Sequence, residues 1–457
     1  MLLLLVFQLT VSAMMFFMVH ILKHWKLLLF PQIFLEFDLE LSHEDVGLYI
    51  IFSYLSFFYG TLAGGLIWGK LSDHLSKHSM IILSMVLMML FNYLQAVNND
   101  FKSFIFFRFL TGLSMNLENL NKSFVHEFFA KDYRQKAFFI ESASHTLGTL
   151  SGPLLGLLVY NASAKFLTAC FYISIAMFIV IVLYVVAFTV MENVPQQSVT
   201  SRRNSKVISQ EAIEDEENIP FKKWGTIIIP TWREAIIHVF YNNKISRNLI
   251  CIYLINASIF HVGLVLTTNF LTLSASKGEY HTDEKVLAIG NFLGGIGSLF
   301  SIYYLSTLDK DPRLYKLYMI TTIMVNVIAL FITPFIKYII TAFNPTWHSI
   351  IIYSFFVFKE FVSFYLYSQL LQHLINISIH KIYRKALNFV MTVIKAFSHG
   401  FFFTFVAPFF YFTVKNPTLQ NYKPFNYAFT FWTIGIIQFS TLRLFKYLKL
   451  PLEKRSI

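Results

Sequence analysis

Long apolar segments constrain the fold of this chain more than any other feature. Charged residues make up only 14% of its 457 residues, against about 25% in ordinary soluble domains. A helix needs about 20 apolar residues to cross a bilayer, and transmembrane β-strands are much shorter than the runs seen here. The sequence therefore predicts an all-α membrane protein with twelve transmembrane helices, covering residues approximately 4–34, 45–68, 79–98, 103–125, 138–160, 166–190, 247–272, 285–306, 315–337, 348–376, 386–412 and 425–446.

The net charge is +12, and the basic residues are distributed unevenly between the two sides of the predicted membrane. If both termini lie inside, 24 lysines and arginines fall in inside segments and 7 in outside loops. This is the positive-inside bias of membrane proteins. We therefore expect membrane lipid as a partner and no nucleic acid, because little soluble surface is left to bind it. We expect no cleaved signal peptide, since the first apolar run can direct insertion.

A long polar segment divides the chain into two similar parts. We predict an N-terminal six-helix half at 1–190, an inside connector at 191–246, and a C-terminal six-helix half with a short basic tail at 247–457. A faint internal repeat supports this division, because Arg108 in the fourth run has a charged counterpart in the tenth, Lys359-Glu360. Parallel repeats of this kind are common in transporter folds.

A polar hairpin, Gly69-Lys-Leu-Ser-Asp73-His-Leu-Ser-Lys77-His78, joins the second and third runs. Gly69 lets a neighbouring helix approach closely because it has no Cβ. Asp73 suits the positive end of a helix dipole, and Lys77 adds a basic residue to the hairpin. Taken by themselves, these residues are consistent with a simple polar turn.

The fourth run carries a polar stripe. At about 100° per residue, Arg108, Gly112, Asn116, Asn119 and Lys122 share one face of a helix. On the edge of that face, Glu118 lies four residues before Lys122 and can pair with it. A charge at membrane depth is costly unless it faces protein or water. The stripe therefore predicts either the lining of a cavity between the halves or a hydrogen-bonded seam between helices.

The fifth run carries small residues at helical spacing, Gly148, Gly152 and Gly156, with Pro153 among them. Such a stripe lets two helices pack closely in lipid, and proline allows a bend. We expect a helix-packing face here. On the same helix Glu141 and His145 are four residues apart, which allows a proton-sensitive pair or a plain structural hydrogen bond.

No cofactor or metal site is predicted. His20, His24, His261 and His399 are spread over three runs, and no set of three or more ligands gathers in any one of them. The two cysteines, Cys170 and Cys251, both lie in apolar runs, which gives no disulfide framework.

Taken together, the Gly69–His78 hairpin, Arg108-Phe-Leu-Thr-Gly112 and Gly148-x-x-x-Gly152-Pro153-x-x-Gly156 resemble motifs of the major facilitator superfamily. The residues of these motifs are most similar to those of the organic-solute and zinc-chelate facilitator branch. The resemblance implies a twelve-helix transporter, not an enzyme, in which the hairpin latches the two halves and the arginine takes part in proton coupling. It also implies a small-molecule substrate, moved by alternating access. In the family, the third motif is associated with exporters.

A second interpretation rests on composition. Glycine is only 18 of 457 residues, while phenylalanine reaches 52. Phe-rich, Gly-poor chains are typical of AT-rich organelle genomes, and nucleotide bias in a nuclear genome is the other explanation of the same composition. The alternative is therefore a transport-inactive, transporter-derived subunit of a large respiratory complex in the mitochondrial inner membrane. Its partners would be other membrane subunits, and its centre would be filled by aromatic side chains.

Overall fold

The computed structural model is helical throughout the part of the chain that it describes. That part comprises residues 2–26, 29, 33, 43–71, 75, 77–98, 100–115, 131–163, 165–192, 237, 240–241, 244–273, 284–307, 312–360, 367, 370–371, 374–375, 381–415 and 427–446. Most of the predicted connector, and the polar residues that follow Met115, lie outside it.

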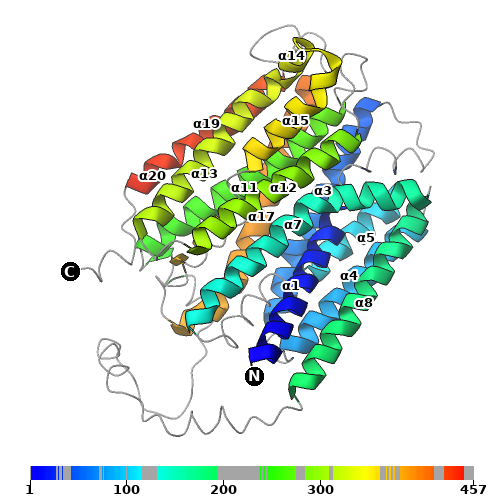
Figure 1. Cartoon of the computed structure of the whole chain (residues 1–457), viewed down its shortest axis with the longest axis vertical. Coiled ribbons are helices and arrows are strands. Elements are labelled where there is room, and N and C mark those ends of the chain that lie inside the picture. The colour runs from blue at the N-terminus through cyan, green and yellow to red at the C-terminus, as the bar shows by residue number, and fades with distance from the viewer. Residues whose placement is uncertain are drawn as a thin grey trace.

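Six long helices form the N-terminal half, drawn in blue to green-cyan in Figure 1. They are α1 (Leu2–His24), α3 (His43–Leu71), α4 (Lys77–Val97), α5 (Phe101–Ser114), α7 (Lys131–Ser163) and α8 (Phe166–Glu192). The twelve apolar runs predicted the first six helices at nearly these places. The first and fourth runs form shorter helices than expected, because α1 gives way to a turn at Trp25 and Lys26 and α5 ends at Ser114.

Six further long helices form the C-terminal half, from green to red in Figure 1. They are α11 (Lys244–Leu273), α12 (Glu284–Thr307), α13 (Pro312–Ile332), α15 (Pro345–Glu360), α17 (Lys381–Lys415) and α19 (Tyr427–Ser440). Short pieces accompany them: η5 (Thr333–Phe335), α14 (Ile336–Thr341) and α20 (Leu442–Lys446). The predicted all-α fold with twelve helices in two halves is confirmed.

The helices present apolar side chains outward, as a bilayer requires. Among the described residues, seven helices are long and apolar enough to cross a membrane by themselves. The outer face of α8 shows the pattern most clearly, because Phe171, Phe178 and Val186 are about half exposed while Ala169, Cys170 and Met177 are fully buried. In water such a face would be unfavourable, but hydrocarbon chains cover it at no cost.

Two helix pairs join the halves. Helix α3 packs along α17, and α7 packs along α12. Each pair brings together helices that are far apart in the sequence, so the two halves meet along two seams with the centre of the molecule between them (Figure 1).

Candidate functional site

A close backbone contact between α3 and α5 sets the position of Arg108. A Cβ atom on Gly112 would lie 2.1 Å from the backbone oxygen of Phe57, and one on Gly64 would lie 2.2 Å from that of Leu113. Trp68 Nε1 donates to the same Leu113 oxygen at 2.8 Å. Because only glycine allows this approach, α5 is held in one register on α3.

Arg108 is buried where α1, α3 and α5 meet, and its side chain is only 2% exposed. Its Nη2 atom donates to the backbone oxygen of Lys23 at 3.4 Å. Its guanidinium carbon lies 4.9 Å from the centre of the Phe57 ring, a cation–π distance. Arg108 therefore faces the protein interior, in a bonded seam beside the centre of the molecule.

A second buried cation, Lys26, lies in the turn after α1. Its ammonium donates to Gln95 Oε1 of α4, and Gln95 Nε2 donates to the Phe104 oxygen of α5 at 3.1 Å. The ammonium also lies 5.2 Å from the Trp25 ring and 5.3 Å from the Phe166 ring. The charge is thus surrounded by aromatic faces, which attract cations.

An aromatic and histidine cluster joins the halves midway along the helices. We call it the interface cluster, and it consists of Tyr54 and Phe58 of α3, His261 of α11, and His399 and Phe403 of α17. All five side chains are buried.

Rings from the two halves stack directly on one another within this cluster. Phe58 and His399 are stacked with centroids 5.3 Å apart, and Tyr54 and Phe403 are stacked at 5.6 Å. His261 meets both Phe58 and His399 edge-on, at 5.2 and 5.1 Å.

Two lysines flank the interface cluster from opposite halves. Lys395 of α17 lies one helical turn before His399, and both Lys395 and Lys23 of α1 are half-buried. Lys23 lies 5.8 Å from the Phe57 ring, which is the ring that Arg108 also contacts. The Phe57 ring therefore lies against two positive side chains, Lys23 and Arg108.

Short polar contacts fix the helices around this position. Ser258 of α11 and Ser398 of α17 share a hydrogen bond at 2.7 Å, which sets the two histidine-bearing helices against each other. Across the halves, Tyr59 Oη of α3 and Thr404 Oγ1 of α17 are 3.2 Å apart.

The halves also meet nearer the side that the charge distribution predicts to be inside. Phe139 of α7, Ile302 of α12 and Leu370 form one buried apolar group. On the other seam, a Cβ on Gly65 of α3 would lie 2.8 Å from a methyl group of Val393 of α17. We call these two places the inner contacts.

Lys359 and Glu360 lie together at the end of α15, away from the interface cluster. Lys359 Nζ is 3.3 Å from Glu360 Oε1, and both side chains are nearly buried. Ser298 of α12 donates to the backbone oxygen of Glu360, so this pair is packed within the C-terminal half. The structure does not bring it next to Arg108.

The glycine stripe of α7 packs against α1. A Cβ on Gly148 would lie 2.5 Å from the Phe17 oxygen, and one on Gly156 would lie 2.2 Å from the Trp25 oxygen. Gly152 and Pro153 are buried on the same continuous helix.

This contact also brings His145 of α7 onto His20 of α1, with ring centroids 3.5 Å apart. Glu141 is buried one turn earlier on α7. The sequence spacing predicted a pair of His145 with Glu141, but it gave no indication of the contact between His145 and His20.

The latch and the rest of the polar stripe are only partly described. Gly69 is buried at the end of α3 and Lys77 begins α4. His78 Nδ1, next to it, lies 2.9 Å from Tyr184 Oη of α8. The remaining predicted residues, and the side chain of Lys77, lie outside the described part of the chain; the residues are Asp73, Asn116, Glu118, Asn119 and Lys122.

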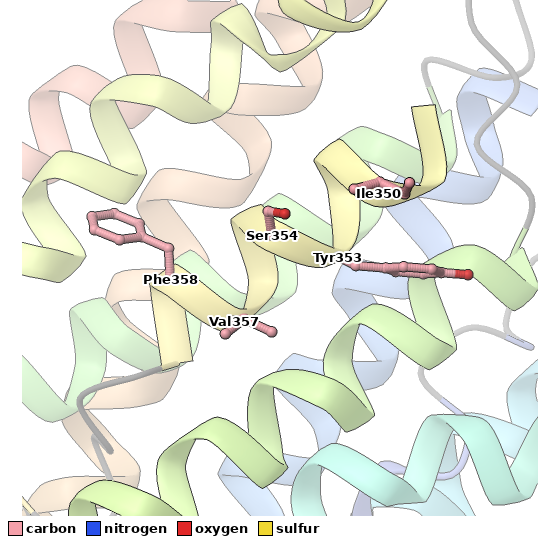
Figure 2. A pocket seen from close by; sticks show the side chains of 5 residues that line it. All are labelled: Ile350, Tyr353, Ser354, Val357 and Phe358. Atoms are coloured by element: carbon pink, nitrogen blue, oxygen red, sulfur yellow. The ribbon is translucent and has the colours of Figure 1, made fainter. Parts of the chain in front are cut away.

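A separate open pocket of about 410 Å³ lies along α15. Figure 2 shows its lining side chains, Ile350, Tyr353, Ser354, Val357 and Phe358. It shares no residue with the interface cluster, and its only polar side chains are two hydroxyls. No group of three or more histidine, cysteine or acidic side chains within the described ranges could hold a metal ion.

Sequence reasoning missed the interface cluster because its members come from different helices. His261 and His399 are isolated in the sequence and carry no mutual spacing. The one available signal was a titratable residue in the middle of an apolar run, which is costly in a membrane and marks a functional position by default.

Comparisons with known proteins identify what this arrangement resembles. The family model described as Major Facilitator Superfamily matches residues 1–401. A probable peptide/nitrate transporter of Arabidopsis thaliana is 28% identical over 131 residues, which is 28% of this chain and 27% of that protein. Zinc Induced Facilitator 1 of the same plant is 28% identical over 121 residues, 26% of this chain and 25% of its own length. The matched region thus spans about a quarter of these curated relatives.

Solved structures match over nearly the whole chain. A D-xylose–proton symporter superposes with a TM-score of 0.65 at 15% identity, covering 98% of both chains. The human organic anion transporter MFSD10 superposes with a TM-score of 0.63 at 14% identity, covering 96% of this chain and 99% of that one. At such identities the likeness concerns the fold.

Proposed function

Because the chain belongs to the major facilitator superfamily, a family of membrane transporters and not enzymes, we propose that it moves a small organic solute or chelate by proton-coupled alternating access. The interface cluster carries this proposal. It lies midway along the helices, between two pseudo-repeated halves, which is where transporters of this architecture place their substrate sites.

Alternating access needs seams that close tightly and part again. Few side chains interlock at the closest points of the two seams, α3 with α17 and α7 with α12. The reason is that Gly65 and Gly295 have no side chain there. A Cβ on Gly295 would lie 3.1 Å from Leu150 Cβ. The described contacts across the α3–α17 seam are stacked rings and one hydrogen bond between Tyr59 and Thr404 at 3.2 Å, which are weak enough to part when the halves rock.

Proton coupling would be divided between two kinds of side chain. Arginine keeps its proton under all ordinary conditions, so Arg108 supplies a fixed positive charge. Histidine is the side chain whose charge changes near neutral pH, and His261 and His399 lie in the same central region. We infer that Arg108 and Lys23 tune whether these imidazoles take up a proton.

Several finer assignments stay predictions. They include the latch role of Gly69, Asp73 and Lys77, the coupling role of Asn119 and Lys122, and the mitochondrial inner membrane as the location. The family and the named relatives are transporters and facilitators, which lends no support to a transport-inactive respiratory subunit. Aromatic closure of the centre does not favour that alternative, because one closed state of a transporter requires it as well.

Replacement of Arg108 tests the proposal. We expect Arg108→Ala to abolish solute movement driven by a pH gradient in reconstituted vesicles, measured by mass spectrometry of solutes taken up from a metabolite mixture. Arg108→Lys should retain part of it, because a charge remains but the fixed guanidinium geometry is lost.

Lys102→Ala, an exposed change on the same helix, is the matched control, and thermal unfolding in detergent verifies that each variant folds. Undiminished gradient-driven uptake by folded Arg108→Ala would remove Arg108 from the coupling machinery. Absence of uptake by the unmodified protein, for every solute in the mixture, would contradict transport itself.

A further inference from the structure

Two histidines lie face to face where α1 packs against α7 (Figure 1). The rings of His20 and His145 have centroids 3.5 Å apart and planes within 17° of parallel, and both side chains are buried. Gly148, one turn after His145, allows this approach, because a Cβ on it would lie 2.8 Å from His20 Cβ. The pair is therefore built into the helix contact, since a larger residue at 148 would push α1 away from α7.

Charged residues continue the pair along both helices. Glu141 lies four residues before His145 on α7, so the two side chains share one face of that helix, and Glu141 is only 1% exposed. Lys23 follows His20 by three residues on α1, and its backbone oxygen accepts the hydrogen bond from Arg108 at 3.4 Å. We call this series the proton row: Glu141, His145, His20, Lys23 and Arg108, in order from α7 through α1 to α5.

The other helices that pack on α1 and α7 carry few titratable groups at this level. Helix α8 packs on both, and its residues 166–189 include no charged residue and no histidine. Helix α12 packs on α7, and its described charged side chain, Lys285, is exposed in the first turn. Within the described helices, the charged groups that flank the histidine pair are thus Glu141 on one side and Lys23 with Arg108 on the other.

Two imidazoles at this separation bind protons as one unit. Two positive charges so close together repel each other strongly where water is scarce, so the stack accepts a first proton far more readily than a second, and the titration belongs to the pair. A nearby carboxylate favours the charged form of the pair, whereas nearby cations disfavour it. Because these opposing influences come from different helices, a movement of α1 or α5 relative to α7 changes the proton affinity of the pair.

One end of the proton row lies at the level of the inner contacts. Glu141 follows Phe139 by two residues on α7, and Phe139 forms the buried apolar group with Ile302 and Leu370. When the inner contacts part, water from the predicted inside can reach this end. The other end is Arg108, whose guanidinium rests on the Phe57 ring beside the interface cluster. The row therefore connects the inner side of the molecule with its centre.

We propose that His20 and His145, together with Glu141, form a site for one exchangeable proton, separate from the two imidazoles of the interface cluster. The proposal rests on the proposed proton-coupled transport and names a place where the proton binds. Protonation adds one positive charge beside Lys23 and Arg108. It therefore favours an arrangement of the N-terminal half in which these cations lie further from the pair, and the Phe57 ring beneath Arg108 carries that shift toward the interface cluster.

Nitrogen-15 NMR of histidine-labelled protein in lipid vesicles tests the site without any solute. The signals of the pair are identified by their loss in His20→Gln and His145→Gln. We expect the pair to take up one proton between about pH 4 and pH 9, and His145→Gln to shift the midpoint of His20 by at least about one pH unit. Two imidazoles that titrate independently of each other, or that take up no proton in this range, would overturn the site.

Accumulation of solute in vesicles tests the role of the site in coupling. Across a gradient of about one pH unit, coupling to one proton supports about tenfold accumulation of a neutral solute. His145→Phe keeps a ring in the stack but cannot take up the proton, so we expect it to lose this accumulation while still exchanging the same solute when no gradient is present. His20→Gln should behave in the same way.

His348→Gln is the matched control, since His348 Nε2 lies 3.1 Å from the Phe343 oxygen near the start of α15, away from α1 and α7, and it should retain both accumulation and exchange. Full accumulation by folded His145→Phe and His20→Gln would remove the pair from coupling. If neither variant folds, Glu141→Gln, which should weaken accumulation, and the NMR titration of the unmodified protein decide the outcome.

The two measurements distinguish failure of the site from failure of transport. If the unmodified protein moves no solute, the transport function is contradicted, while the NMR titration still decides whether the pair binds a shared proton. If it accumulates solute in response to the gradient but the pair titrates as two independent imidazoles, the transport function stands and the proton site is overturned.

Discussion

The two halves share an architecture but bury different polar groups. In the N-terminal half, cations are buried: Arg108 donates to a backbone oxygen and stacks on Phe57, and Lys26 is held by Gln95. In the C-terminal half, Lys359 is buried together with its acidic partner Glu360, and a neutral amide ladder runs through the core. Asn326 Nδ2 of α13 donates to Gln438 Oε1 at 2.7 Å, and Gln438 Nε2 of α19 donates to Asn256 Oδ1 at 3.2 Å.

The difference indicates a division of labour. The ladder satisfies its own donors and acceptors, and Asn256 extends it to Thr441 at 3.2 Å. Such a network needs nothing from outside the half. The cations Arg108 and Lys26 of the other half are held by a backbone oxygen, an amide oxygen and aromatic rings. We infer that the N-terminal half supplies charge to the centre, while the C-terminal half, apart from its two central histidines and Lys395, supplies a stable wall.

Substitutions at the glycine contacts should give the largest difference in stability loss between the two halves. A Cβ on Gly112 would strike backbone, 2.1 Å from the Phe57 oxygen, whereas one on Gly263 would lie 3.2 Å from a movable methyl group of Leu330. We expect Gly112→Ala to destabilise by about 3 kcal/mol or more, because α3 must move. Gly263→Ala should cost less than about 1 kcal/mol. Thermal unfolding in detergent measures both, and equal losses would show that the two halves pack alike.

Replacing one buried glutamine in each half by leucine compares a hydrogen bond to a buried charge with hydrogen bonds between neutral groups. Gln95→Leu removes the oxygen that holds Lys26 and should cost about 1.5–3 kcal/mol, as for hydrogen bonds to charged groups. Gln438→Leu should cost about 0.6–1.7 kcal/mol, the range for neutral hydrogen bonds in membrane proteins.

The double variant Lys26→Met/Gln95→Leu is the control, since replacing both partners by apolar groups can be nearly neutral. We expect it to regain most of the stability lost by Gln95→Leu in chemical denaturation. A double variant as unstable as Gln95→Leu alone would mean that Lys26 acts through its packing and not through its charge.

The smallest expected effect concerns the start of α5. A hydrogen bond from the Ser103 side chain, and a second from the Ser103 amide at 2.9 Å, lower the pKa of the Asp100 carboxyl below the ordinary value of 3.8. A lowered pKa in the folded state adds stability above the unfolded-state value, which is lost as pH falls through the folded-state value. We expect a slight loss of stability of the N-terminal half below about pH 4.

Asp100→Asn keeps a capping side chain without a titrating group. Its unfolding midpoint should therefore lack this small acid-side decline. An unchanged decline in Asp100→Asn would assign the effect to other carboxyl groups.

Local sequence signals predicted the helices well, because length and hydropathy act within one segment. The burial of Arg108 also followed from the cost of a charge in lipid. Its partners did not, because Lys23 and Phe57 lie on other helices and contact it only after α3 and α5 have packed. His261 and His399 were missed for the same reason.

Low glycine content was a misleading guide to packing. The chain has only 18 glycines, yet Gly60, Gly64 and Gly112 lie at close backbone approaches between α3 and α5, and Gly65 and Gly295 lie on the seams. Position matters more than number here, because a single glycine is enough to let two helix axes approach. Composition averages over the chain and carries no such positional information.

Two neighbouring residues of α3, Phe57 and Phe58, contact different groups. Phe57 carries the ring beneath the Arg108 guanidinium, and Phe58 carries the ring stacked on His399. Successive side chains on a helix are separated by about 100°, so the two rings turn together as parts of one rigid rod. Any roll or tilt of α3 that frees Phe58 from the other half must also shift the surface on which the guanidinium rests. Helix α3 therefore couples the two events, because the same rotation that separates the halves also changes the surroundings of a buried charge.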